Sequence, residues 1–82
     1  MEHEEIRTKV VGVLATIAPE MSPAALAPDK SLRDQLDMDS VDVLNFVAGL
    51  TKTFGIEIPE NDFRHVFTID HCVAYIAART KK

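Results

Sequence analysis

The chain has 82 residues and a net charge of −4, with 46% hydrophobic and 27% charged residues. This length allows one small domain over residues 1–82, and the composition is typical of a folded globular protein. A negative chain is a poor ligand for nucleic acid, because phosphates are bound by clustered Lys and Arg. The single cysteine, Cys72, excludes an internal disulfide and a cysteine-based metal cluster.

The N-terminal residues are acidic and lack the apolar stretch of a signal peptide. No apolar run approaches the ~18 residues that a membrane span requires. We therefore expect a monomer in the cytosol that neither crosses a membrane nor binds nucleic acid.

The first predicted helix covers residues 3–18 and ends at Pro19. Its apolar residues recur at the spacing of one helix face. They are Ile6, Val10, Val13, Leu14 and Ile17. Residues 19–38 follow as a long loop that contains three prolines. Three leucines can hold this loop against a core, and Ser31 or Asp29 can cap a short helical turn over 31–36. The leucines are Leu26, Leu32 and Leu36.

A central helix is predicted over about 40–54, with Asp39 as its N-cap and Gly55 at its end. One apolar row consists of Val43, Phe46, Val47, Leu50 and Phe54. A second row consists of Val41, Leu44 and Ala48. A helix that is apolar over so much of its circumference is expected to lie centrally and contact several neighbours.

The last third of the chain begins with an extended link that buries Ile56 and Ile58. A short helical segment follows over 61–66, and Thr68 caps a last helix over 69–79. The apolar stripe of that helix is Ile69, Cys72, Val73 and Ile76. The predicted fold is an all-α four-helix bundle, with three main helices, one short helix and a long loop after the first helix.

The segment Asp37-Met38-Asp39-Ser40-Val41-Asp42 places a serine in the first turn of the central helix. Free backbone N–H groups and the helix dipole favour an anion there, so a phosphate esterified to Ser40 would be stabilised. The flanking carboxylates can attract a basic enzyme. An Asp-Ser pair by itself is more often only a helix cap, and that alternative is the better one for the pair alone.

Three groups of residues together resemble the acyl carrier protein family. Leu32 and Leu36 precede Asp39-Ser40-Val41, and Phe54-Gly55-Ile56-Glu57-Ile58-Pro59 follows one helix length later. Thr68-Ile69 then opens a last helix that carries Tyr75-Ile76. The resemblance covers about residues 5–78, and the joint spacing is far more specific than any single motif.

The resemblance implies that Ser40 receives 4′-phosphopantetheine from coenzyme A through a phosphopantetheinyl transferase. The thiol of that arm would carry an acyl group as a thioester, so the chain is not an enzyme and has no catalytic or metal-binding residues. Its partners would be acyl-loading and acyl-processing enzymes with basic docking surfaces. The residues expected to dock partners are Asp37, Asp39, Val41, Asp42, Ala48 and Glu57. Candidates for lining an acyl pocket are Phe46, Leu50, Ile58, Phe63 and Ile69, for which plain core packing is the favoured alternative.

The chain departs from the family pattern at several positions. Leu36-Asp37-Met38 stands where a glycine is usual, Phe63 replaces a smaller residue, and Lys52 lies where the central helix usually carries an acid. These departures indicate a carrier dedicated to one pathway rather than to housekeeping fatty acid synthesis. Two alternatives stay open: a peptidyl or aminoacyl carrier, and an unmodified helical adaptor that binds partners through its acidic face.

Other site types are excluded by residue identity. A calcium loop starting at Asp37 would need Gly at position 42 and Glu at position 48, where the chain has Asp42 and Ala48. The three histidines form no metal-binding pattern with Cys72, which lies on an apolar stripe and is expected to be a core residue.

Overall fold

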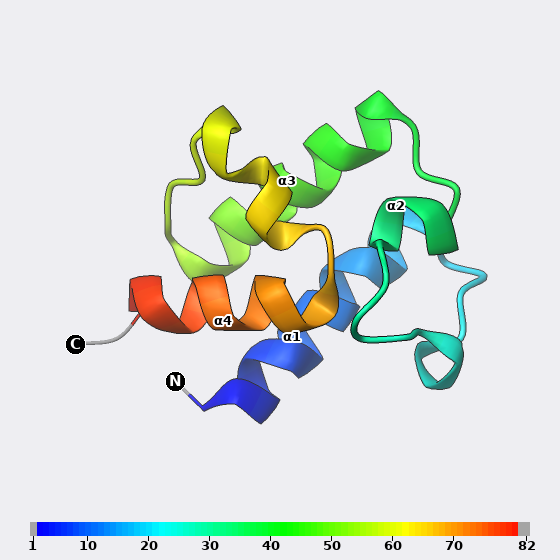
Figure 1. The fold of residues 1–82 in the computed structure, drawn as a ribbon, viewed down its shortest axis with the longest axis horizontal. Helices are drawn as coiled ribbons and strands as arrows, with labels where there is room; N and C mark the ends of the chain where they lie inside the picture. Colours follow the sequence, from blue (N-terminus) through cyan, green and yellow to red (C-terminus); the bar gives the residue numbers. More distant parts are fainter. Residues whose placement is uncertain (1, 81–82) are drawn as a thin grey trace.

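The computed structural model describes residues 2–80, and all the regular elements in that range are helices, with no strand among them (Figure 1). In chain order the elements are α1 (His3–Ile17), η1 (Pro23–Ala25), α2 (Leu32–Gln35), α3 (Ser40–Phe54), η2 (Glu60–Val66) and α4 (Ile69–Thr80). The predicted all-α bundle of three main helices and one short one is confirmed. The short segment η2 is a 3-10 helix, and η1 was not predicted.

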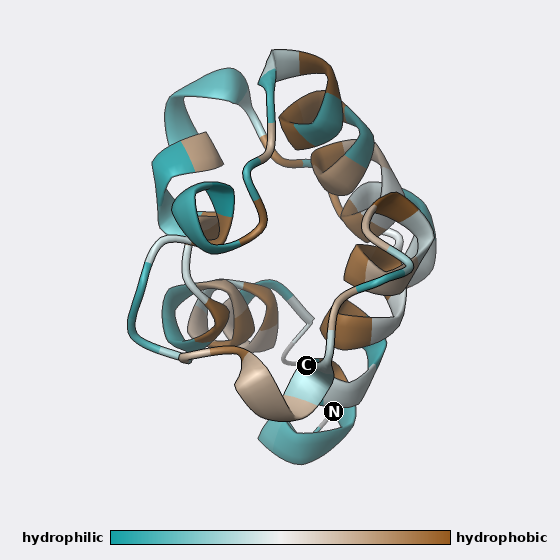
Figure 2. Cartoon of the chain, turned by 90° about the vertical axis from the view of Figure 1, so that its right-hand side faces the viewer, coloured by the Kyte–Doolittle hydropathy of each residue, from teal (hydrophilic) through white to brown (hydrophobic). Residues whose placement is uncertain are grey.

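One hydrophobic core lies between the three long helices, where their apolar positions meet (Figure 2). Helix α1 packs against both α3 and α4, and α4 also packs against η2. Leu14, Phe46, Leu50 and Ile76 are fully buried in this core. Burying side chains of this size contributes about 1.5–3 kcal/mol each.

The first apolar row of α3 lies in the core, but the second row is not buried. Val41 is 62% exposed and Leu44 is 56% exposed, the two large hydrophobic side chains of the described chain that lie most open to solvent. Ala48, on the same face, is also exposed. The other helices of this short chain cover only the side of α3 that faces the core.

The long loop after α1 is held by hydrogen bonds rather than by regular structure. The side-chain amide of Gln35 accepts from the Ala27 N–H at 2.7 Å and donates to the Ala27 carbonyl at 2.9 Å. The Leu32 N–H donates to the Phe67 carbonyl at 2.6 Å, and the Asp70 N–H donates to the Pro28 carbonyl at 3.0 Å. The loop is therefore tied to the chain segment that opens α4, and Leu26 and Leu32 are buried as predicted.

A cluster of side chains fastens η2 to α4. One carboxylate oxygen, Asp62 Oδ2, accepts from the Tyr75 hydroxyl at 2.8 Å and from Arg79 Nη2 at 2.9 Å. The Arg79 guanidinium also lies 4.6 Å from the centre of the Tyr75 ring, and His65 stacks on that ring at 6.2 Å. This cluster holds η2 in position against α4.

No helix among residues 2–80 combines the length and the apolar character that crossing a membrane would require.

Candidate functional site

Ser40 is the first residue of α3, and its side chain is exposed. Among residues 2–80, no hydrogen bond of the Ser40 hydroxyl is found, so this oxygen is not engaged inside the protein. The structure therefore confirms the prediction that this hydroxyl is exposed at the start of α3.

The backbone before Ser40 is shaped by two residues. Met38 is buried, and its N–H donates to the Arg33 carbonyl at 2.9 Å while its own carbonyl accepts from Arg33 Nε at 3.3 Å. Asp37 has a φ of 52°, which places it in the left-handed region that favours glycine but that Asp also tolerates. The turn at Asp37 and the buried Met38 together direct the following residues outward.

The start of α3 is closed by a capping box. The Asp42 N–H donates to Asp39 Oδ1 at 2.8 Å, and the Asp39 N–H donates to Asp42 Oδ2 at 3.3 Å. Both predicted positions, Asp39 at the N-cap and Asp42 at the third helical residue, are confirmed. The box occupies the Asp42 N–H and leaves the N–H groups of Ser40 and Val41 without a backbone or side-chain partner in the described chain.

This geometry fits a phosphodiester on Ser40. The hydroxyl is exposed and unengaged, and two free N–H groups of a helix start lie beside it, where an anion is stabilised. No histidine forms a hydrogen bond to Ser40 in the described residues, and His65 instead stacks on Tyr75. The exposed hydroxyl can therefore accept a phosphate ester.

The predicted docking residues belong to α3 or lie close to its ends in the chain. Asp37, Asp39 and Asp42 surround the start of the helix, Ala48 is exposed in its middle, and Glu57 is exposed just past its end. Val41 directly follows Ser40 and projects into solvent.

Sequence reasoning missed Leu44 as a surface residue. It lies three positions after Val41, which puts the two side chains next to each other on one helix face. Both are more than half exposed, so the helix carries an open apolar patch beside Ser40. The sequence does contain the pattern, because Val41, Leu44 and Ala48 repeat at i, i+3 and i+7. Val41 and Ala48 are predicted docking residues, whereas Leu44 between them is not.

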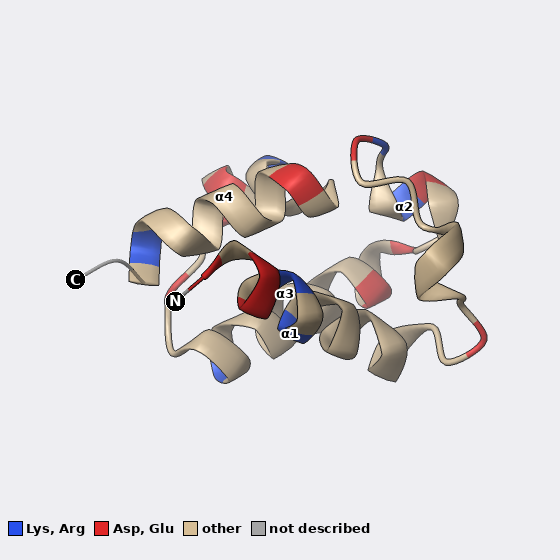
Figure 3. Cartoon of the chain, turned by 90° about the horizontal axis from the view of Figure 1, so that it is seen from below, with Lys and Arg blue, Asp and Glu red and all other residues tan. Residues whose placement is uncertain are grey.

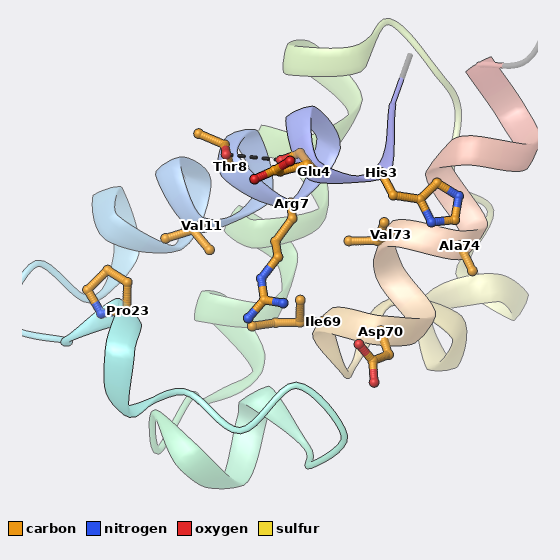
Figure 4. A pocket seen from close by; sticks show the side chains of 10 residues that line it. All are labelled: His3, Glu4, Arg7, Thr8, Val11, Pro23, Ile69, Asp70, Val73 and Ala74. Atoms are coloured by element: carbon orange, nitrogen blue, oxygen red, sulfur yellow. Dashed lines mark hydrogen bonds between the residues drawn. The ribbon is translucent and has the colours of Figure 1, made fainter.

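The five candidate pocket residues lie in the core or against it. Phe46, Leu50 and Ile69 are fully buried, and Ile58 and Phe63 pack partly buried against them. Of these five, Ile69 also lines an open cavity of about 710 Å³ between α1 and α4, where the Arg7 side chain extends toward Ile69 (Figure 4). The other four residues do not line that cavity. In this structure the predicted pocket residues are therefore packed in the core or against it.

Two groups have pKa values raised by their surroundings. Burial raises the pKa of the Cys72 thiol from 9.0 to about 12, in agreement with its predicted place in the core. Partial burial raises the pKa of Tyr75, and its hydrogen bond to Asp62 acts in the same direction. Neither group contacts Ser40 in the described hydrogen bonds.

Comparison with known proteins places this geometry in a family. The family model described as a phosphopantetheine attachment site matches residues 4–76. An acyl carrier protein of Renibacterium salmoninarum is 33% identical over 73 residues, covering 85% of this chain and 90% of the relative. One from Campylobacter hominis is 36% identical over 73 residues, covering 89% of this chain and 86% of the relative. A third, from Acidothermus cellulolyticus, is 30% identical over 80 residues, covering 98% of this chain and 94% of the relative.

These matches cover almost the whole chain, and they agree with the helical fold and with the exposed serine at the start of α3. The chain therefore belongs to the acyl carrier protein family, whose members are non-catalytic carriers with a covalently bound 4′-phosphopantetheine arm.

Proposed function

We propose that Ser40 is the residue that bears the arm, and that a phosphopantetheinyl transferase attaches it. The single observation that carries this proposal is the exposed, unengaged hydroxyl at the first residue of α3, beside the free N–H groups of Ser40 and Val41. The other two serines of the chain, Ser22 and Ser31, do not start a long helix, and Ser31 is used as the cap of α2.

In the attachment reaction, Ser40 Oγ forms a bond to the phosphorus of the pantetheine phosphate of coenzyme A. The bond from that phosphorus to the adenosine bisphosphate breaks, and the hydroxyl proton passes to a base on the transferase. The chain contributes the exposed oxygen and the N–H groups that stabilise the new phosphodiester. When bound, the arm supplies a thiol that holds an acyl group as a thioester.

Partner enzymes dock, in this proposal, on the exposed face of α3 and the acids around its start. Asp37, Asp39 and Asp42 attract basic surfaces and speed encounter, while Val41 and Ala48 bury apolar area once contact is made. The exposed patch of Val41 and Leu44 supports this assignment, because large apolar side chains that lie together on a surface mark interaction sites. Glu57 adds one exposed acid just past the end of α3, beyond Lys52 in the chain.

The cargo pathway is proposed from the sequence departures alone. Lys52 on α3 and Phe63, which packs partly buried against the core, differ from carriers of housekeeping fatty acid synthesis. These differences support a carrier dedicated to one pathway. The acyl pocket stays a prediction: sheltering a chain would require Phe46, Leu50 and Ile69 to separate, because all three are now fully buried. Location in the cytosol and a monomeric state also stay predictions.

The attachment is tested by incubating the unmodified protein with coenzyme A and a broad-specificity transferase, then measuring its mass. We expect the wild type and Ser31→Ala to gain one phosphopantetheine group and Ser40→Ala to gain none. Ser31→Ala is the matched control, because Ser31 Oγ caps α2 by accepting from the Asp34 N–H at 3.4 Å. A gain that persists in Ser40→Ala, or no gain in a folded wild type, would contradict the proposal.

A thiol count gives an independent readout. Because burial keeps Cys72 protonated and inaccessible, the native unmodified protein should expose no reactive thiol, and the loaded protein should expose one. An unmodified adaptor, the alternative from the sequence, predicts partner binding that survives Ser40→Ala and is lost when Asp39 and Asp42 are both changed to Lys.

A further inference from the structure

The exposed face of α3 carries opposite charges at its two ends. At the start of the helix, Asp39 and Asp42 stand beside Ser40. Lys52 is exposed near the other end, and it lies four residues after Ala48 and eleven after Val41, which is the same row of the helix. Figure 3 shows the same arrangement, with acidic positions in red near the start of α3 and a basic position in blue near its end.

The positive end includes a second lysine from the neighbouring helix. Lys9 of α1 and Lys52 of α3 both line an open groove of about 490 Å³ between these helices, together with Gly12 and Gly49. Lys9 lies 4.0 Å from the carboxylate of Glu5, which offsets its charge in part. Among residues 2–80 no ion pair of Lys52 is found, so its charge is open to a partner.

The two charged ends are far enough apart to act separately. Asp42 and Lys52 are ten residues apart, which corresponds to about 15 Å along a helix. This exceeds the Debye length of about 8 Å at physiological ionic strength. The exposed side chains of Leu44 and Ala48 lie between Asp42 and Lys52, and the exposed Val41 directly precedes Asp42 in the chain.

We propose that this face docks a partner protein whose surface carries charges in the complementary order. That surface has Lys or Arg opposite Asp39 and Asp42, an apolar centre opposite Val41 and Leu44, and an Asp or Glu opposite Lys52. The order of charges fixes the direction of α3 on the partner and so points Ser40 toward the partner's active site. A surface that is basic along its full length is disfavoured, because it brings a like charge to Lys52.

This inference rests on the proposed function, because the arm on Ser40 defines which end of the face meets the active site. The probe is an acyl-transferring enzyme whose carrier-docking surface is built from Lys and Arg along its length. Its kcat/KM is measured at low salt with the loaded wild type, Lys52→Gln and Lys52→Glu. We expect kcat/KM to rise in that order, by about tenfold for Lys52→Glu, and the difference to shrink as salt is added.

Arg7→Glu is the matched control, because it changes the net charge by the same amount as Lys52→Glu. Arg7 is exposed and lines the cavity between α1 and α4 rather than the groove beside α3. We expect its kcat/KM to stay within about twofold of the wild type, since rates respond to charge near the docking face.

A charge swap on the probe then tests the acid opposite Lys52. Each Lys or Arg on the docking surface of the probe enzyme is changed singly to Glu. For at least one of these enzyme variants, kcat/KM should be about tenfold higher with the wild-type carrier than with the Lys52→Glu carrier. Equal effects of Lys52→Glu and Arg7→Glu, or no such preference in any probe variant, would overturn the docking order. Every carrier variant is first loaded with the arm, and its mass is measured. Absence of loading counts against Ser40 as the attachment site. Full loading followed by equal kcat/KM for Lys52→Glu and Arg7→Glu counts against the docking order alone.

Discussion

At the scale of single residues, the position of Ser40 depends on its two predecessors. Met38 is buried in the core and Asp37 adopts a φ of 52°, so the chain turns outward immediately before the helix starts. The family usually has a glycine in this region, where the chain reads Leu36-Asp37-Met38. The structure explains why the exchange is tolerated: the position needs left-handed backbone, which Asp adopts more readily than most residues. Asp37 is therefore compatible with the turn that precedes Ser40.

Cys72 gives a prediction on stability at high pH. Its folded pKa is about 12, raised from 9.0 by burial, so below pH 9 the thiol is protonated in both the folded and the unfolded state. Between these two values the unfolded state loses the proton and the folded state keeps it. The free energy of unfolding should therefore fall as pH rises through this window, by at most about 1.4 kcal/mol per pH unit from this group.

The measurement is urea unfolding of the wild type and Cys72→Ala at several pH values from 8 to 11, for which about 1 kcal/mol is a resolvable difference. Cys72→Ala should be less stable at neutral pH because it leaves a cavity, but its stability should decline less as pH rises. The raised pKa of Tyr75 acts in both proteins and cancels in the comparison. Parallel declines in the two proteins would show that Cys72 ionises equally in the folded and unfolded states.

At the scale of elements, the two glycines between α1 and α3 have different roles. A Cβ added at Gly49 would lie 2.6 Å from Val13 Cγ1, whereas one added at Gly12 would meet nothing within 4 Å. Gly49 therefore permits the close approach of the two helices, and Gly12 occupies an exposed site where glycine only weakens α1. Neither role is visible in the sequence, because both residues are glycines inside predicted helices.

We expect Gly12→Ala to stabilise the protein by about 0.5–1 kcal/mol, since alanine has the higher helix propensity. Gly49→Ala gains the same propensity but forces α1 and α3 apart, and such overpacking costs about 1–3 kcal/mol. Thermal or urea unfolding of both variants measures the difference. Equal stabilisation by the two substitutions would show that the contact between Gly49 and Val13 does not constrain the helices.

The elements themselves were largely predictable from the sequence, because each has a local cause. Apolar spacing gave the three long helices, Asp39 and Gly55 fixed the ends of α3, and Thr68 caps α4 by accepting from the His71 N–H at 3.0 Å. The exposure of Leu44 was not predictable, because periodicity shows that a row is apolar but not whether the rest of the chain covers it. The side-chain cluster on Asp62 was missed for a similar reason, since it joins residues 13 and 17 positions apart.

At the scale of the whole molecule, the two irregular segments are joined to each other. The loop before α3 is hydrogen-bonded to the segment after η2 through Leu32 with Phe67 and through Pro28 with Asp70. We expect amides of residues 19–38 and 55–68 to exchange faster than those of α3, because these segments hold few regular hydrogen bonds.

The amide of Leu32 should be the exception within these segments, since it donates to the Phe67 carbonyl. Asp70, at the start of α4, should be protected for the same reason through Pro28. Hydrogen exchange followed by NMR measures each amide separately. Protection of residues 19–38 equal to that of α3 would contradict this account, as would fast exchange at both Leu32 and Asp70.

The family and the site follow from the whole chain rather than from any one motif. An Asp-Ser pair at a helix start is by itself a common cap, and the structure confirms that Asp39 does cap α3. The attachment role is inferred from that cap together with the exposed Ser40, the free N–H groups and the match over residues 4–76. No comparable set of residues identifies the cargo. The side chains that would contact an acyl group are core residues, which any small helical bundle requires.

The most direct test is to purify the protein from its own host, digest it and locate the arm by fragmentation mass spectrometry. The account predicts phosphopantetheine on the peptide that contains Ser40, with the bond assigned to that side chain. An arm found on Ser22 or Ser31, or a chain that carries none while other carriers of the same cell are loaded, would contradict it.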